Sequence, residues 1–171
     1  MDEIRLAVLR GQTVTLRSLA ATDAVAIATA ASESRQQFAY IRVPAGVEEA
    51  QRYIEAALAD RAAGRRLPLA IVWQDRVVGS TSYLDLQRWR WPAGSALQRT
   101  DHPDAVEIGS TWLAASAQRT RCNTEAKYLL LSHAAAPTCR LRMVPFGIRH
   151  TTQSCGPSGP MCARSLKALA R

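Results

Sequence analysis

The stretch AVEIGSTWLAASAQRTRCNTEAKYLLLSHAAA, residues 105–136, decides the fold of this chain. An apolar strand pattern from Val106 to Leu113 leads through a polar loop into a helical pattern that is predicted to begin at Thr124. The first turn of a helix has backbone N–H groups without intrahelical partners and carries the positive end of the helix dipole. Arg119 and Arg121 add two guanidinium groups, which suit phosphate oxygens. The stretch therefore predicts an anion site, although an arginine-rich loop can also be ordinary solvated surface.

The residues before this stretch alternate between helical and strand patterns. The predicted elements are a strand over 11–19, a helix over 23–32, a loop or short helix over 34–44, a helix over 47–63, and a hairpin of strands 67–73 and 77–86. Gly79 lies inside the last of these strands and indicates a bulge or a close approach of backbone. A mixed order of this kind predicts an α+β domain.

Three segments resemble one known family: VVGSTSYLDL at 77–86, EIGSTWL at 107–113 and AQRTRCNTEAKYLLL at 117–131. They are similar to the GNAT acetyltransferase superfamily, more narrowly to its RimJ/RimL type, which acetylates protein N-termini and other amines. The resemblance covers roughly residues 9–134 and implies a mixed, mostly antiparallel sheet flanked by helices. The family holds the pyrophosphate of acetyl-CoA on a glycine-rich loop or on a Gln-Arg-Thr-x-x-Asn variant, and this chain carries the variant. Arg121 stands where a small residue is common, so its side chain could crowd the diphosphate or bind it.

The resemblance implies acetyl-CoA as cosubstrate and no metal. It assigns backbone groups around Ile108 to Trp112 to the pantetheine arm, and Asn123 and Thr124 to capping the helix. The predicted cofactor-binding residues are Ile108, Ser110, Trp112, Gln118, Arg119, Thr120, Arg121, Asn123 and Thr124.

Glu107 is the predicted general base, because an amine must lose a proton before it attacks a thioester and Glu107 heads the strand that leads to the loop. The alternative is a strand-edge glutamate in a salt bridge. Tyr40, Ser82 and Asp85 are the predicted acceptor contacts. An aromatic residue closing the core, or polar residues on a solvent-facing strand, would need no such function.

The formal net charge of +8 is concentrated at the C-terminal end, since residues 134–171 contain six Lys or Arg and no Asp or Glu. The family pattern breaks there. Residues 1–134 are expected to form the acetyltransferase domain, with 105–134 as its cofactor unit. Residues 135–171 are expected to be an atypical basic tail, of the composition that a GC-rich gene read out of frame would give. The last strands of the family fold would then be missing or irregular.

Three readings of function follow. The first is an N-acetyltransferase that transfers acetyl from acetyl-CoA to a primary amine, in particular a protein or peptide N-terminus. The second is an impaired, truncated or frameshifted relative that binds CoA weakly. The third, ranked last, is a nucleic-acid-binding module that uses the tail together with Trp89 and Trp91, which could instead simply pack their loop onto the sheet. No apolar run reaches the ~18 residues of a membrane span, so a cytoplasmic protein without a membrane partner is expected, and the oligomeric state stays open.

Overall fold

A computed structural model describes residues 8–38, 41–95 and 103–135. These residues form a five-stranded sheet in the order β1-β2-β3-β4-β5, and every neighbouring pair is antiparallel. The strands are β1 (Leu9–Arg10), β2 (Val14–Ser18), β3 (Arg66–Trp73), β4 (Arg76–Gln87) and β5 (Ala105–Leu113). Tyr40 and the tail over 136–171 lie outside the described residues, so the expectations about them stay predictions.

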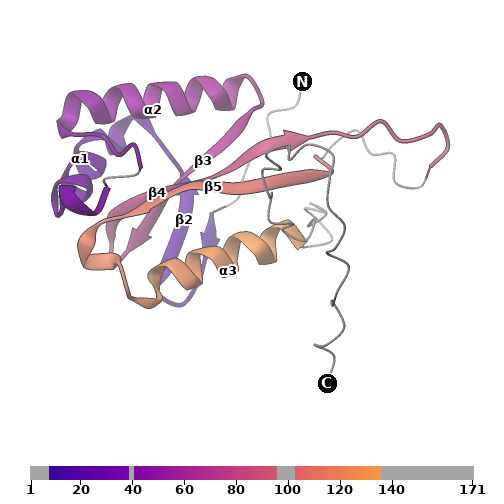
Figure 1. Ribbon diagram of the computed structural model, residues 1–171. Helices are drawn as coiled ribbons and strands as arrows, with labels where there is room; N and C mark the ends of the chain where they lie inside the picture. Colours follow the sequence, from indigo (N-terminus) through magenta and orange to yellow (C-terminus); the bar gives the residue numbers. More distant parts are fainter. Residues whose placement is uncertain (1–7, 39–40, 96–102, 136–171) are drawn as a thin grey trace, which may run out of the picture.

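Helices cover both faces of the sheet, which confirms the predicted α+β fold (Figure 1). On one face lie α1 (Ala24–Ser32) and α2 (Gly46–Ala62), and on the other lies α3 (Arg121–Ala135). Short 3-10 turns are η1 (Ala21–Asp23), η2 (Arg35–Phe38) and η3 (Ala115–Ala117). No helix among the described residues is long and apolar enough to cross a bilayer.

The core fills the space between the sheet and the helices of each face. Fully buried apolar side chains come from every layer: Leu16, Ile27, Ile54, Leu69, Ile71, Val78 and Leu130. Helix α2 follows the predicted amphipathic pattern, with Ala50, Ile54 and Ala57 buried.

The predicted hairpin between β3 and β4 is confirmed. Its turn consists of Gln74 and Asp75, which both have a positive φ, of 51° and 58°. Two residues with φ > 0 match the right-handed twist of the flanking strands. Gly79 meets both expectations, because Val78 is the extra residue of a bulge opposite β3, and a Cβ on Gly79 would clash with the carbonyl oxygen of Trp112.

Candidate active site

A bulge interrupts β5 at the centre of the sheet edge. Ser80 pairs with Trp112 and Ser82 with Gly109, so Ser110 and Thr111 together oppose the single residue between the two serines. Ser110 has a φ of +49°, which is uncommon for a residue other than glycine. A bulge bends the strand and leaves its backbone groups out of the ladder. Among the described residues no strand pairs with the outer edge of β5, so these groups lie at an open edge.

Glu107 directs its carboxylate along β5 toward this bulge. A Cβ on Gly109 would lie 3.0 Å from Oε1 of Glu107 and 2.7 Å from Cδ1 of Leu84. Glu107 pairs with Leu84, and therefore shares the sheet face that α1 and α2 cover. Its side chain is exposed, and no Lys or Arg in the described part of the chain lies within ion-pair distance of it. The salt-bridged alternative for this glutamate therefore finds no partner among those residues.

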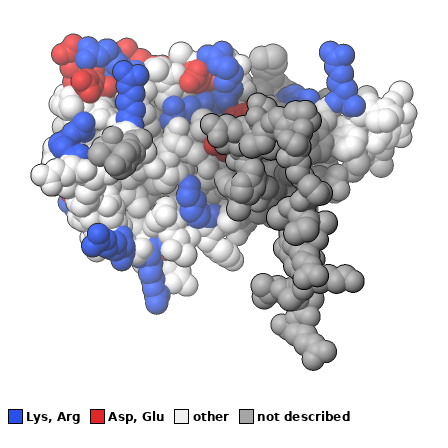
Figure 2. Space-filling model, in the orientation of Figure 1, with Lys and Arg blue, Asp and Glu red and all other residues white. Residues whose placement is uncertain are grey.

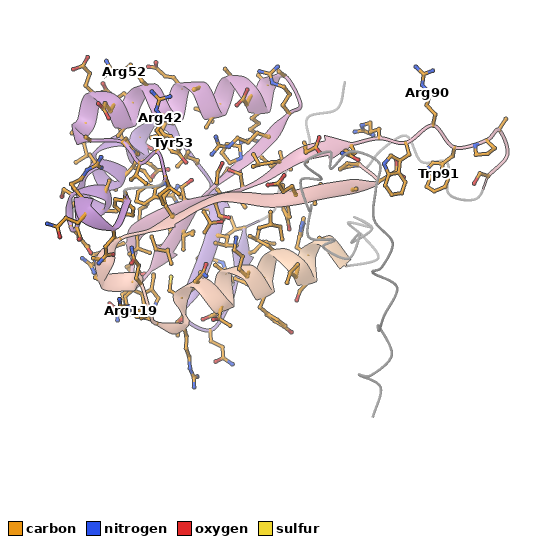
Figure 3. All side chains as sticks on the ribbon, in the orientation of Figure 1. Arg42, Arg52, Tyr53, Arg90, Trp91 and Arg119 are labelled. Atoms are coloured by element: carbon orange, nitrogen blue, oxygen red, sulfur yellow. The ribbon has the colours of Figure 1, made fainter. Side chains whose placement is uncertain are left out.

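On the same face as Glu107, on the other side of Leu84, four polar side chains form what we call the Arg66 network. Arg66 donates from Nε to Oγ of Ser82 (2.8 Å) and from Nη2 to the hydroxyl oxygen of Tyr53 (3.2 Å). The Tyr53 hydroxyl in turn bonds to Oγ of Ser80 at 2.9 Å. Figure 3 shows Tyr53 on the side of α2 that faces the sheet. Sequence reasoning missed Tyr53 and Arg66, although the helical period of α2 puts Tyr53 beside Ile54 and Ala57 on its inner side.

The structure separates the two predicted acceptor residues of β4. Ser82 is completely buried and its hydroxyl accepts the hydrogen bond from Arg66. Asp85 is exposed and has a φ of +48°. Its carboxylate accepts a hydrogen bond of 2.7 Å from the side-chain amide of Gln87. Ser82 thus lies beside Glu107, whereas Asp85 lies in a second irregularity, between Leu84 and Gln87. Direct contacts of either residue with an acceptor stay predictions.

From the opposite face, α3 holds the bulge in place. Lys127 donates from Nζ to Oγ1 of Thr111 at 2.6 Å, and the hydroxyls of Thr111 and Thr81 lie 2.8 Å apart. Burial lowers the pKa of Lys127. Farther along α3, the hydroxyl of Tyr83 donates to the carbonyl oxygen of Leu130 at 2.6 Å. These bonds connect the irregular strand to a regular helix, which limits its freedom to move.

After Leu113 the chain turns a sharp corner into α3, and here the prediction needs a correction. The helix begins at Arg121, so the predicted start at Thr124 was wrong by three residues. Thr120 is the N-cap: its hydroxyl accepts from the amide of Cys122 at 3.1 Å and donates to the carbonyl oxygen of Ala117 at 2.7 Å. Asn123 and Thr124 are not caps, because they already lie in the first helical turn. The helix-initiating signal was the threonine of the Gln-Arg-Thr segment itself.

The corner carries side chains of both charges: two arginines, and the carboxylate of Glu33, which accepts hydrogen bonds from the amide (2.7 Å) and the hydroxyl (3.0 Å) of Ser116. Arg119, with a φ of +59°, and Arg121, the first residue of α3, are both exposed. Arg119 projects from the corner in Figure 3, and Figure 2 shows Lys and Arg side chains but no visible Asp or Glu at this lower-left part of the molecule. The backbone N–H groups of Arg121 and Asn123 have no intrahelical partner by their position in the first turn. Two guanidinium groups and these amides form a surface suited to a phosphate.

Of the other predicted cofactor residues, three have side chains that contact the rest of the protein, and the fourth, Ser110, has an exposed side chain. Gln118 uses Nε2 to bond the carbonyl oxygen of Leu113 at 2.8 Å, and so fixes the corner. Trp112 is buried, with its ring 6.0 Å from that of Phe38 in an edge-to-face contact, and Ile108 packs against the core. The cofactor-binding roles of all four remain predictions.

Cys122 and Glu125 support the corner from within α3. Burial, with a smaller effect of the Glu125 charge, raises the pKa of the Cys122 thiol to about 11, so the thiol stays protonated. The carboxylate of Glu125 accepts a hydrogen bond of 2.9 Å from the backbone amide of Thr13, just before β2. The N-terminal half of the helix is thereby tied to the segment just before β2.

Trp89 and Trp91 pack against each other instead of forming a flat surface. Their ring centroids lie 5.6 Å apart in an edge-to-face arrangement. The backbone amide of Trp89 and Nε1 of Trp91 both donate to the carboxylate of Asp104, at 2.7 Å and 2.9 Å, and the Trp91 bond is the main reason for the lowered pKa of Asp104. In Figure 3 Arg90 and Trp91 point to opposite sides of the loop. This geometry favours the packed-loop alternative over base stacking.

The fold has known relatives among solved structures. A GCN5-related N-acetyltransferase from Brucella melitensis superposes with a TM-score of 0.58 at 20% identity, covering 77% of this chain and 56% of that one. The ribosomal-protein alpha-N-acetyltransferase RimL, also solved in complex with coenzyme A, gives 0.58 at 17% identity, covering 75% and 65%. The microcin C7 self-immunity acetyltransferase MccE, in complex with acetyl-CoA and AMP, gives 0.54 at 19% identity, covering 71% and 62%. The chain thus spans less than two thirds of the length of each of these three structures.

The sequence itself matches one domain family. No curated protein sequence matches the chain. The match to the acetyltransferase (GNAT) domain covers residues 13–151, which includes β2 to β5 and all three helices and continues beyond residue 134, where the motifs quoted above end. This chain belongs to the acetyltransferase (GNAT) domain family.

Proposed function

We propose that this protein transfers the acetyl group of acetyl-CoA to a primary amine, and that the amine is the N-terminus of a protein or peptide. The observation that carries the proposal is the position of the Glu107 carboxylate over Gly109, beside the bulge of the strand that leads to the corner before α3. The structural neighbours include the ribosomal-protein alpha-N-acetyltransferase RimL, which supports a protein N-terminus as the acceptor.

Acetyl-CoA fits the residues at both ends of this strand segment. Arg119, Arg121 and the first-turn amides of α3 hold the diphosphate at an exposed corner. The carboxylate of Glu33 also reaches this corner, where it is bonded to the amide and the hydroxyl of Ser116. The backbone of the Ser110 bulge, at the open edge of β5, holds the pantetheine arm by main-chain hydrogen bonds. When bound, the cosubstrate supplies a thioester whose acetyl carbon is open to attack.

Glu107 serves as the general base. The amine nitrogen forms a bond to the acetyl carbon while the carbon–sulfur bond breaks, and the proton that the amine must lose goes to the Glu107 carboxylate, directly or through one water molecule. The sulfur leaves as a thiolate, which takes up a proton from solvent water. Because no described Lys or Arg neutralises Glu107, its charge is available to attract a cationic amine as well as to accept its proton.

The test compares the chain with a Glu107→Gln variant in two assays, coenzyme A binding and acetyl transfer to an unblocked peptide followed by mass spectrometry. Loss of the base is expected to lower kcat about a hundredfold while the Kd for coenzyme A is unchanged. Glu55→Gln, on the exposed part of α2, is the matched control and should keep full activity. Acetyl transfer that Glu107→Gln leaves intact would overturn the role of Glu107. Absence of both binding and transfer would overturn the function, and binding without transfer would indicate the impaired relative.

A further inference from the structure

We propose that Arg66 selects acceptors that carry a carboxylate close to the reacting amine, in particular peptides with Asp or Glu among their first two residues. This inference rests on the proposed function, because it assigns the acceptor side of the same site.

The Arg66 network fixes the guanidinium in one orientation. Ser82 and Tyr53 accept from two of its donors, and its Cζ atom lies 5.6 Å from the centroid of the Tyr53 ring, in cation–π geometry. Ser80 and Ser82 are completely buried, and Tyr53 and Arg66 are half-buried. A guanidinium has five N–H donors, so several remain for a ligand after these two bonds. Because the group is already ordered, a carboxylate that binds it pays little ordering entropy.

Arg66 differs in its charge environment from three other arginines. Arg17, Arg52 and Arg65 each form an ion pair with a carboxylate. In the described residues no carboxylate lies within 4.0 Å of the Arg66 guanidinium, whose partners are hydroxyl groups. A half-buried cation bonded only by neutral groups gains from an incoming anion, since charge-assisted hydrogen bonds are the stronger class.

The register of the sheet places this cation in the same row as Glu107, two strands away, with Leu84 between them. Arg66 pairs with Leu84, and Leu84 pairs with Glu107, so all three side chains belong to one row of the same face. Both charged groups lean in the same direction along the sheet: the guanidinium bonds Ser82, and the carboxylate lies over Gly109. Ser82 and Gly109 are direct cross-strand partners, whose Cα atoms in such pairs are about 5 Å apart. A cation and an anion therefore lie on either side of Leu84 on this face without forming an ion pair with each other.

An acceptor that satisfies both groups has an amine and a carboxylate separated by a few atoms. In a peptide, the α-amine and the side-chain carboxylate of a first or second residue Asp or Glu meet this description. The amine then lies at Glu107 and the carboxylate at Arg66. A peptide with Lys at the second residue would bring a like charge to Arg66, which disfavours it.

The experiment uses three peptides that differ only in Asp, Asn or Lys at the second residue, with the full chain and coenzyme A or acetyl-CoA. We expect kcat/KM to be about tenfold higher for the Asp peptide than for the Asn peptide, and lowest for the Lys peptide. In Arg66→Gln the three values are expected to converge. Arg52→Gln, on the outer side of α2 (Figure 3), is the control and should keep the preference. Equal rates of the wild-type chain on the three peptides would overturn the proposal, and so would an Arg66→Gln variant that is slower on all three by the same factor.

Equilibrium binding of the same labelled peptides separates this inference from the proposed function. A preference for the Asp peptide that depends on Arg66 supports the inference even if acetyl transfer is absent, in which case only the proposed function fails. Transfer without any charge preference retains the function and overturns the inference. Should Arg66→Gln not fold, as judged by circular dichroism, the wild-type order Asp, Asn, Lys and its weakening in high salt still decide the matter.

Discussion

The carboxylate of Glu107 lies so close to Gly109 that a Cβ there would come within 3.0 Å of its Oε1 atom, so the present orientation of Glu107 is best accommodated with glycine at position 109. In Gly109→Ala the new methyl group would lie 3.0 Å from Oε1 of Glu107 and 2.7 Å from Cδ1 of Leu84. We expect the carboxylate to turn away from the bulge and kcat to fall about tenfold or more, because the base loses its position. The Kd for coenzyme A, measured by calorimetry, should not change. A Gly109→Ala variant with unchanged kcat would show that the position of Glu107 is irrelevant to the reaction.

The two arginines at the corner before α3 are expected to strengthen the binding of coenzyme A. Replacing Arg119 and Arg121 together by alanine removes both guanidinium groups and leaves the helix N-terminus intact. The Kd for coenzyme A is expected to rise about tenfold or more, and the wild-type affinity should decrease with added salt. Arg52→Ala, on the outer side of α2, is the control. Should Arg121→Ala alone bind coenzyme A more tightly than the wild type, its side chain crowds the diphosphate, and the assignment of Arg121 as a phosphate ligand would be wrong.

Thr120, the N-cap of α3, is expected to contribute to the stability of the folded state. Its hydroxyl is bonded on both sides, to the amide of Cys122 and to the carbonyl oxygen of Ala117. Thr120→Ala is therefore expected to lower the free energy of unfolding by about 1 kcal/mol, measured by urea denaturation. Asn123→Ala and Thr124→Ala, inside the first turn, should change it by less than about 0.5 kcal/mol. A larger loss of stability in Asn123→Ala or Thr124→Ala than in Thr120→Ala would instead support the helix start at Thr124 that the sequence pattern predicted.

The parts of the fold that the sequence predicted depend on contacts between near neighbours. The helical period of residues 47–63 and the alternation on both sides of Gln74 and Asp75 are local signals, and both elements formed where expected. Gly79 was informative because a glycine within an apolar strand usually marks a bulge or a close approach of another backbone. The strand, loop and helix of the cofactor unit were recognisable because they are consecutive in the chain.

The acceptor side could not be predicted, because it depends on the register between distant segments. Arg66 and Glu107 share one row of the sheet, on either side of Leu84, only because β4 pairs with both β3 and β5. A shift by one residue would put them on opposite faces. The bulge itself has no local signal: Ser110 adopts a positive φ that serine seldom prefers, and it does so in a strand that is held by Lys127 through Thr111. The burial of Ser82, whose hydroxyl is bonded to Arg66 of β3, likewise follows from tertiary contacts and not from its neighbours in the sequence.

The ion pair between Arg17 and Asp23 predicts how stability depends on pH. Burial alone would raise the pKa of Asp23, but the hydrogen bonds from Arg17 and from the Ala20 amide, with the Arg17 charge, outweigh it and hold this pKa below its ordinary value of 3.8. The folded state therefore binds fewer protons than the unfolded state in this range. The stabilisation from Asp23 is complete above pH 3.8 and is lost as the pH falls through the lower pKa of the folded state.

Asp23→Asn tests this contribution by urea denaturation at several pH values. At neutral pH the variant should be less stable than the wild type by about 2 kcal/mol, because the guanidinium of Arg17 loses its charged partner. The difference between the two proteins should shrink as the pH is lowered below 3.8, since the wild-type carboxyl then becomes neutral as well. Asp60→Asn, which removes the exposed partner of Arg65, is the control and should have little effect at any pH. A difference between Asp23→Asn and wild type that stays constant down to the lowest pH would mean that the carboxyl contributes through its shape and hydrogen bonds and not through its charge.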